Sequence, residues 1–130
     1  MLTNAGKDMI ASQLANTSTQ AAACNWIALS ANNGAPGAGD TTLTGEITTG
    51  GGGLVRAQGA YAHTGGTNTL TVTKTFTTNG SDSLPVTIAK YGLFNAASSG
   101  TLGFESLFGA TAVLAAPGDQ VTVTVTITLS

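Results

Sequence analysis

Hydrophobic and polar residues alternate most regularly in the last stretch of the chain. From Val121 to Leu129 every odd position is apolar, and every even position from Thr122 to Thr128 is threonine. A period of two with β-branched residues on both faces predicts a β-strand that turns one face to a core and the other towards water. We therefore expect an all-β framework.

Further strand-like segments are separated by turns rich in Gly, Asn and Ser. Apolar or alternating runs occupy residues 24–31, 41–48, 54–64, 69–77, 85–94, 101–108 and 110–115, followed by the final strand. Strands do not alternate with helices, so the pattern predicts an antiparallel β-sandwich or jelly-roll-like domain of about eight strands. Lys74 falls on the apolar face of its strand, where it reaches solvent at an edge, meets a carboxylate or contacts another subunit.

One short helix is expected before the strands, over residues 3–16, with Thr3 or Asn4 as its cap. Its apolar positions share one stripe: Ala5, Met9, Ile10 and Leu14. This stripe packs on a sheet or closes one end of the sandwich. The alternative is a docking arm, which makes Met9, Ile10 and Leu14 candidate interface residues. The whole chain, 1–130, is interpreted as one domain, with the helix and arm in 1–20 and the strands in 24–130.

Charge is scarce in this sequence. Only 8% of the residues are charged, and the formal net charge is −2. The four cations are dispersed and cannot follow a phosphate track, which argues against nucleic acid and against an anionic membrane surface as partners. A nearly neutral, Thr-rich strand surface is adhesive and favours burial against other copies or a partner, so we expect a homo-oligomer. The alternative is a stable extracellular β-domain.

The single cysteine, Cys24, has no partner for an internal disulfide and precedes an apolar run, which predicts a buried, inert thiol. The N-terminal segment has no apolar core of the kind found in signal peptides. No apolar run approaches the roughly 20 residues needed to cross a bilayer. We expect a protein that is made in a cytoplasm and not exported by a recognisable route.

The residues that usually carry chemistry are dispersed. The six acids fall mostly in turns or near a helix start, and the one histidine, His63, has no neighbouring Cys or acid. No serine lies in a nucleophile elbow, and no calcium-loop or zinc spacing occurs. The sequence therefore predicts no catalytic residues, no cofactor, no metal and no enzymatic activity.

The glycine run 50–53 is flanked by two of the few charges, Glu46 and Arg56. If residues 43–48 and 54–59 face each other as a hairpin, these side chains form a structural ion pair at the base of a flexible glycine tip. The functional alternative places the pair at a subunit interface. Gly51 and Gly52 in the tip, together with Lys74, are further candidate interface residues.

Several segments resemble small structural proteins of tailed bacteriophages. They are Leu-Thr-Asn-Ala-Gly-Lys-Asp (2–8), Trp-Ile-Ala-Leu-Ser (26–30), Leu-Thr-Gly-Glu-Ile (43–47), Gly-Leu-Val-Arg-Ala (53–57), Ile-Ala-Lys-Tyr-Gly-Leu-Phe-Asn (88–95), Gly-Thr-Leu-Gly-Phe-Glu (100–105) and the Gly-Asp turn (118–119) into the final strand. The similarity covers nearly the whole chain and involves core and turn residues. The resemblance implies a virion part, with no catalytic residues to carry over.

Two virion locations follow from this resemblance. A head decoration, or cement, protein bridges neighbouring subunits of the major capsid protein, and a trimer at threefold positions suits that role. The chain lacks the heptads or collagen-like triplets of a long fibre, which favours the head. The alternative is a tail fibre or tail tip protein with a structural or host-adhesion role. Either reading predicts localisation in the virion.

Overall fold

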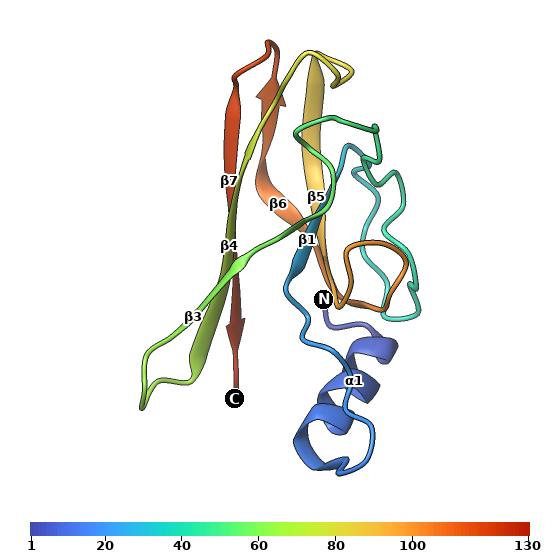
Figure 1. Cartoon of the computed structure of the whole chain (residues 1–130), viewed down its shortest axis with the longest axis vertical. Coiled ribbons are helices and arrows are strands. Elements are labelled where there is room, and N and C mark those ends of the chain that lie inside the picture. The colour runs from blue at the N-terminus through green and yellow to red at the C-terminus, as the bar shows by residue number, and fades with distance from the viewer.

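The computed structural model describes residues 1–130, which form two antiparallel sheets and one N-terminal helix (Figure 1). The elements in chain order are α1 (Asn4–Ala15), β1 (Trp26–Ser30), β2 (Ala57–Gln58), β3 (Ala60–His63), β4 (Thr69–Thr77), β5 (Val86–Phe94), β6 (Leu102–Leu114) and β7 (Gln120–Thr128). One sheet has the order β2-β1-β5-β6 and the other the order β3-β4-β7. The predicted all-β class is confirmed, with seven strands rather than eight.

The strand count differs because three predicted boundaries move. Residues 41–48 form no named strand: Glu46 makes one isolated bridge to Ser30, and Gly45 has a left-handed backbone (φ 71°) that interrupts an extended chain. The runs 101–108 and 110–115 are one continuous strand, β6. The predicted strand 54–64 divides into β2 and β3, which belong to different sheets.

Gly59 lies between β2 and β3, where the chain crosses from one sheet to the other. A Cβ at this position would lie 2.6 Å from the Val72 side chain and 3.2 Å from the Thr73 carbonyl oxygen. Only glycine fits so close to β4, so this residue permits the crossing.

The main core lies between the two sheets. The alternation predicted for the last strand is observed: Val123 and Val125 are buried, whereas the threonines from Thr122 to Thr128 face outward. The buried residues of this core are Ile27, Leu29, Leu54, Val72, Phe76, Ile88, Leu93, Leu114, Val123 and Val125. Since these residues come from both sheets, hydrophobic burial between the sheets holds them together.

A second, smaller core covers the other face of the four-stranded sheet. Leu43, from the long connection between β1 and β2, packs against Ala28, Phe94 and Leu102, with Trp26 partly buried beside them. This connection therefore acts as a layer over the sheet, which is buried on both faces.

Helix α1 is attached mainly through its beginning. Thr3 caps the helix by accepting a hydrogen bond from the Gly6 N–H, and its hydroxyl donates to the Leu102 carbonyl of β6. Gly6 lies so close to β6 that a Cβ would meet the Gly103 carbonyl oxygen at 2.2 Å. The predicted apolar stripe is used only in part, because Met9 is buried whereas Leu14 is 84% exposed.

Candidate functional site

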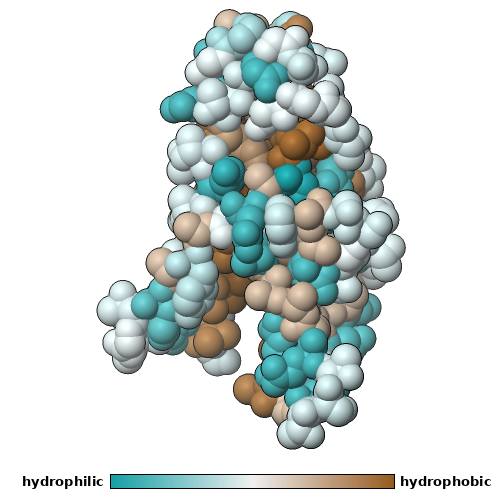
Figure 2. Space-filling view, in the orientation of Figure 1, coloured by the Kyte–Doolittle hydropathy of each residue, from teal (hydrophilic) through white to brown (hydrophobic).

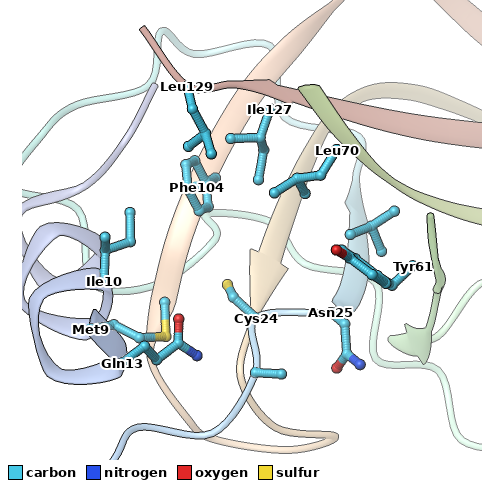
Figure 3. A pocket seen from close by; sticks show the side chains of 12 residues that line it. Met9, Ile10, Gln13, Cys24, Asn25, Tyr61, Leu70, Phe104, Ile127 and Leu129 are labelled. Carbon is cyan, nitrogen blue, oxygen red and sulfur yellow. The ribbon is translucent and has the colours of Figure 1, made fainter. Parts of the chain in front are cut away.

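An apolar cleft separates α1 from the three-stranded sheet. Figure 2 shows the molecule hollowed between two projections, with hydrophobic residues inside the hollow, and Figure 3 shows the side chains that line it. The cleft has a volume of about 320 Å³, and ten of its twelve lining residues are hydrophobic. Its lining residues are Met9, Ile10, Gln13, Ala23, Cys24, Asn25, Tyr61, Leu70, Val72, Phe104, Ile127 and Leu129.

The cleft exists because the two sheets and the helix do not close on one another at this end. Tyr61 of β3 and Leu129 after β7 border it from one side and remain 64% and 60% exposed. Ile10 of α1 faces the same space from the other side and is 38% exposed. None of its lining side chains is charged, and Gln13 and Asn25 are its only amides, so the cleft suits an apolar group rather than a charged ligand.

Cys24 lines the cleft as an unreactive thiol. Its Sγ donates a hydrogen bond to the Leu93 carbonyl oxygen at 3.2 Å. Burial raises the pKa of this thiol to about 12, because the charged thiolate is poorly solvated there. The thiol is therefore protonated at neutral pH and is a weak nucleophile and metal ligand.

The strands beside the cleft have unpaired edges. In the sheet order β3-β4-β7, each outer strand is paired only with β4, so one edge of β3 and one edge of β7 carry free backbone groups. The edge of β6 differs near its start, because Leu2 forms a bridge with Phe104 and the Met1 amine donates to the Glu105 carbonyl at 2.7 Å. The N-terminal segment thus covers part of β6 and leaves β7 open.

The structure brings Glu46 and Arg56 together as a two-pronged ion pair. Arg56 Nε lies 2.9 Å from Oε1, and its Nη2 lies 2.7 Å from Oε2. The same guanidinium donates to the carbonyls of Ala96 and Ser99 and lies 3.5 Å above the Phe94 ring centre. Arg56 therefore joins the β1–β2 connection to the β5–β6 connection.

The predicted hairpin does not form around this pair. Ala57 pairs with Ile27, whereas Glu46 bridges to Ser30, so the two segments follow one another along the same edge of β1. The intervening glycines do not project as a free tip. Gly53 approaches Thr77 so closely that a Cβ would lie 1.7 Å from its carbonyl oxygen.

The candidate interface residues are spread over the molecule. Met9 and Ile10 reach the cleft, but Gly51 and Gly52 lie at the other end, beside the turn after β4. Gly52 is buried beside Asp82 of its own chain. Leu14, also predicted at an interface, is free at the exposed end of the helix.

Lys74 lies on the inward face of β4, as its sequence position predicts, between buried Val72 and Phe76. It forms no ion pair. Pairing with β3 ends at Thr73, so β4 is locally an edge beside Lys74, and the side chain reaches solvent there while its stem stays half-buried.

A buried cluster of charged groups was not predicted. Lys90 of β5 and Glu105 of β6 are 2% and 1% exposed, and Lys90 Nζ lies 3.8 Å from Glu105 Oε2. Asp40 joins them from the β1–β2 connection: its Oδ2 accepts the Gly37 N–H at 2.8 Å, and Glu105 Oε1 accepts the same N–H at 3.1 Å. The sequence feature that could have revealed this cluster is an ionisable residue, Lys90 or Glu105, inside each of two largely apolar strands.

The two carboxyl groups of this cluster have pKa values shifted in opposite directions. Burial raises the pKa of Glu105, and its hydrogen bond with Asp40 raises it further. The same hydrogen bond lowers the pKa of Asp40. Of the two carboxyl groups, Asp40 therefore loses its proton more readily than Glu105.

The other residues of types that often carry chemistry are not brought together in one site. His63 is exposed, with Nδ1 2.8 Å from the Thr69 carbonyl oxygen. No three His, Cys, Asp or Glu side chains are placed to hold a metal ion. None of the helices is both long and apolar enough to pass through a bilayer. Neither protein-family models nor curated proteins gave a match to this sequence.

Proposed function

We propose that this chain is a structural protein of a tailed-bacteriophage virion that decorates the capsid by bridging neighbouring capsid subunits. The observation that carries the proposal is the apolar cleft beside the free edges of β3 and β7. The resemblance of its core and turn segments to small virion proteins supplies the biological setting.

The geometry of this surface favours a polypeptide as the partner. Free backbone N–H and C=O groups on a strand edge are satisfied best by another strand, which adds to the sheet. The adjoining cleft accepts apolar side chains and offers no charged group. We infer that an extended apolar segment of a neighbouring virion subunit pairs along β7 and places a side chain in the cleft.

The low charge of the chain fits this role. With six acids and four Lys or Arg residues, little electrostatic repulsion opposes close packing of many copies on a shell. The chain also associates with itself in this proposal, and light scattering on the purified protein should give the mass of a trimer. A monomeric mass would contradict the self-association.

The direct test is cosedimentation with capsids of the encoding phage that lack the protein. Wild-type protein should bind saturably. Leu129→Ser should weaken binding by about tenfold or more, because it removes a leucine from the contact. Val113→Ser is the matched control, since Val113 is also exposed (64%) but lies on β6 at the other end of the molecule.

The outcomes separate the head from the tail. Binding of wild type and Val113→Ser, with weakened binding of Leu129→Ser, supports both decoration and the cleft. Equal binding of all three proteins would show that the contact with the capsid lies outside the cleft. Binding to isolated tails and not to capsids would favour the tail-associated alternative, in which the exposed ring of Tyr61 offers a surface for a host ligand.

A further inference from the structure

The buried cluster of Lys90, Glu105 and Asp40 contains one unsatisfied atom. Glu105 Oε2 is buried and has no hydrogen-bond partner, and the Lys90 amine lies 3.8 Å from it. A buried carboxyl oxygen without a partner is unfavourable, so the arrangement needs an explanation.

The backbone holds the two side chains in this position. In the pairing of β5 with β6, Gly92 lies opposite Glu105 and Lys90 lies opposite Leu107. Lys90 and Gly92 are two residues apart and therefore share a face of the sheet, so Lys90 and Glu105 are diagonal neighbours. Both side chains are buried, and Gly37 of the β1–β2 connection donates a hydrogen bond to Glu105.

We propose that Lys90 and Glu105 form an intramolecular isopeptide bond, with Asp40 as the acid–base group for its formation. An amine placed against a carboxyl group in a dry, fixed site has the proximity that amide formation needs, and attack requires the nitrogen about 3–3.5 Å from the carbon. Lys90 Nζ, which lies 3.8 Å from Glu105 Oε2, is the nucleophile of this step.

The proposed reaction needs no added reagent. Asp40 takes one proton from the Lys90 ammonium, and the free amine attacks the protonated Glu105 carboxyl carbon. The C–N bond forms, the bond from the carbon to the hydroxyl oxygen breaks, and Asp40 returns a proton so that the hydroxyl leaves as water. The nitrogen then gives a second proton to Asp40. The products are one neutral amide, one water molecule and protonated Asp40.

The hydrogen bonds of Glu105 assign different roles to its two oxygens. Oε1 shares the Gly37 N–H with Asp40 Oδ2, so it lies beside the acid–base group and is the oxygen that leaves as water. Oε2 has no hydrogen-bond partner and becomes the carbonyl oxygen of the amide. Formation of the amide also removes the charges of Lys90 and Asp40 from the cluster.

The bond would join β5 to β6 covalently and lock the β1–β2 connection above them. This inference concerns the chain alone, so it stands or fails independently of the proposed virion role. A cross-linked sheet would resist mechanical load and proteolysis, which are demands on any exposed structural protein.

Mass spectrometry of the folded wild-type protein is the deciding experiment. The intact protein should be lighter than its sequence by one water molecule. Trypsin cleaves after Lys and Arg, so the unmodified chain yields peptides 75–90 and 91–130. The bonded chain should instead yield one peptide, 75–130, lighter by one water, because an acylated Lys90 is not cleaved.

Variants assign the roles. Lys90→Arg should show the full sequence mass, and Asp40→Asn should form the bond more slowly or not at all. Lys74→Arg is the control, because Lys74 is a half-buried lysine outside the cluster, and it should lose water as wild type does.

Two results would overturn the proposal. The first is the full mass for wild-type protein that is shown to be folded by a cooperative thermal transition on the same sample. The second is attachment of peptide 8–56 to peptide 75–130, which would place the bond on Asp40 instead of Glu105. Because the measurement is made on the wild type, a variant that fails to fold does not affect it.

Discussion

The outer face of the four-stranded sheet is covered, whereas the outer face of the three-stranded sheet is exposed. The four-stranded sheet is covered by the β1–β2 connection, where Leu43 completes a second small core and both ion pairs of the chain are found. The three-stranded sheet has no such layer, and its outer face is a set of exposed threonines on β4 and β7. One sheet is an internal layer of the protein, and the other is a surface.

This contrast shows where the chain uses its few charges. Covering a sheet with irregular backbone requires partners for the polar groups of that backbone, and Arg56, Asp40 and Glu105 all contact backbone groups of connections. The three-stranded sheet needs only burial of its inner face. Its outer face, its free edges and the cleft remain available for partners.

The largest expected effect compares the two faces of β4 at neighbouring positions. Phe76→Ala should destabilise the protein by about 3–5 kcal/mol, because Phe76 is 1% exposed in the main core. Thr75→Ala, on the exposed outer face, should change stability by about 0.5 kcal/mol or less. Chemical denaturation measures both. Similar losses for the two variants would contradict the one-sided burial of this sheet.

The next effect tests the covering of the four-stranded sheet. Arg56→Ala should destabilise by about 3 kcal/mol, since it leaves Glu46 without its partner and frees two backbone carbonyls. Lys7→Ala should have almost no effect, because Lys7 is exposed. Arg56→Lys should restore only part of the loss, as lysine cannot make the two-pronged contact. Full rescue by lysine would show that charge alone matters.

A smaller, pH-dependent effect is expected where the glycine run meets the turn after β4. Burial alone would raise the pKa of Asp82, but hydrogen bonds from the backbone N–H groups of Asn79, Gly53 and Leu54 outweigh it, and the pKa is lowered. A lowered carboxyl pKa stabilises the fold above the ordinary aspartate value, about 3.9, and this contribution is lost as the pH falls through the folded value.

Asp82→Asn should therefore be less stable than wild type at neutral pH, and the difference should shrink in acid. Thermal unfolding of both proteins from neutral pH to about pH 2, below the ordinary aspartate range, measures it. A difference that stays constant across this range would show that the carboxylate charge does not hold the glycine run.

The smallest effect concerns the threonine surface. Thr122 and Thr75 hydroxyls lie 2.8 Å apart across β7 and β4. Thr122→Val should change stability by less than about 1 kcal/mol, because cross-strand pairs contribute little and valine keeps the β-branched shape. Chemical denaturation provides the measurement. A large loss would mean that the outer face supports the fold and is not simply a free surface.

Local patterns in the sequence were sufficient for several features. The alternation at 121–129 located the last strand and its buried face, and Thr3 followed by an apolar helical stripe located the helix start. The scarcity of charge made Glu46 and Arg56 natural partners. Each of these inferences depends on neighbours in the chain or on simple charge complementarity.

Other features could not be obtained in this way. The division at Gly59 depends on how closely β4 approaches, and the single long strand β6 depends on its pairing with β5. The stripe on the helix predicted packing over its whole length, yet Leu14 is exposed because the sheets do not extend beneath it. The periodic pattern of hydrophobic residues within a segment gives no information about these distances between segments.

The sequence by itself determined the all-β class, the helix start and which face of the last strand is buried, because backbone geometry imposes a period on side chains. Only the tertiary structure decided that Asp40, Lys90 and Glu105 meet and that the cleft stays open. Such contacts join residues far apart in the chain, and burial there raises the pKa of Glu105.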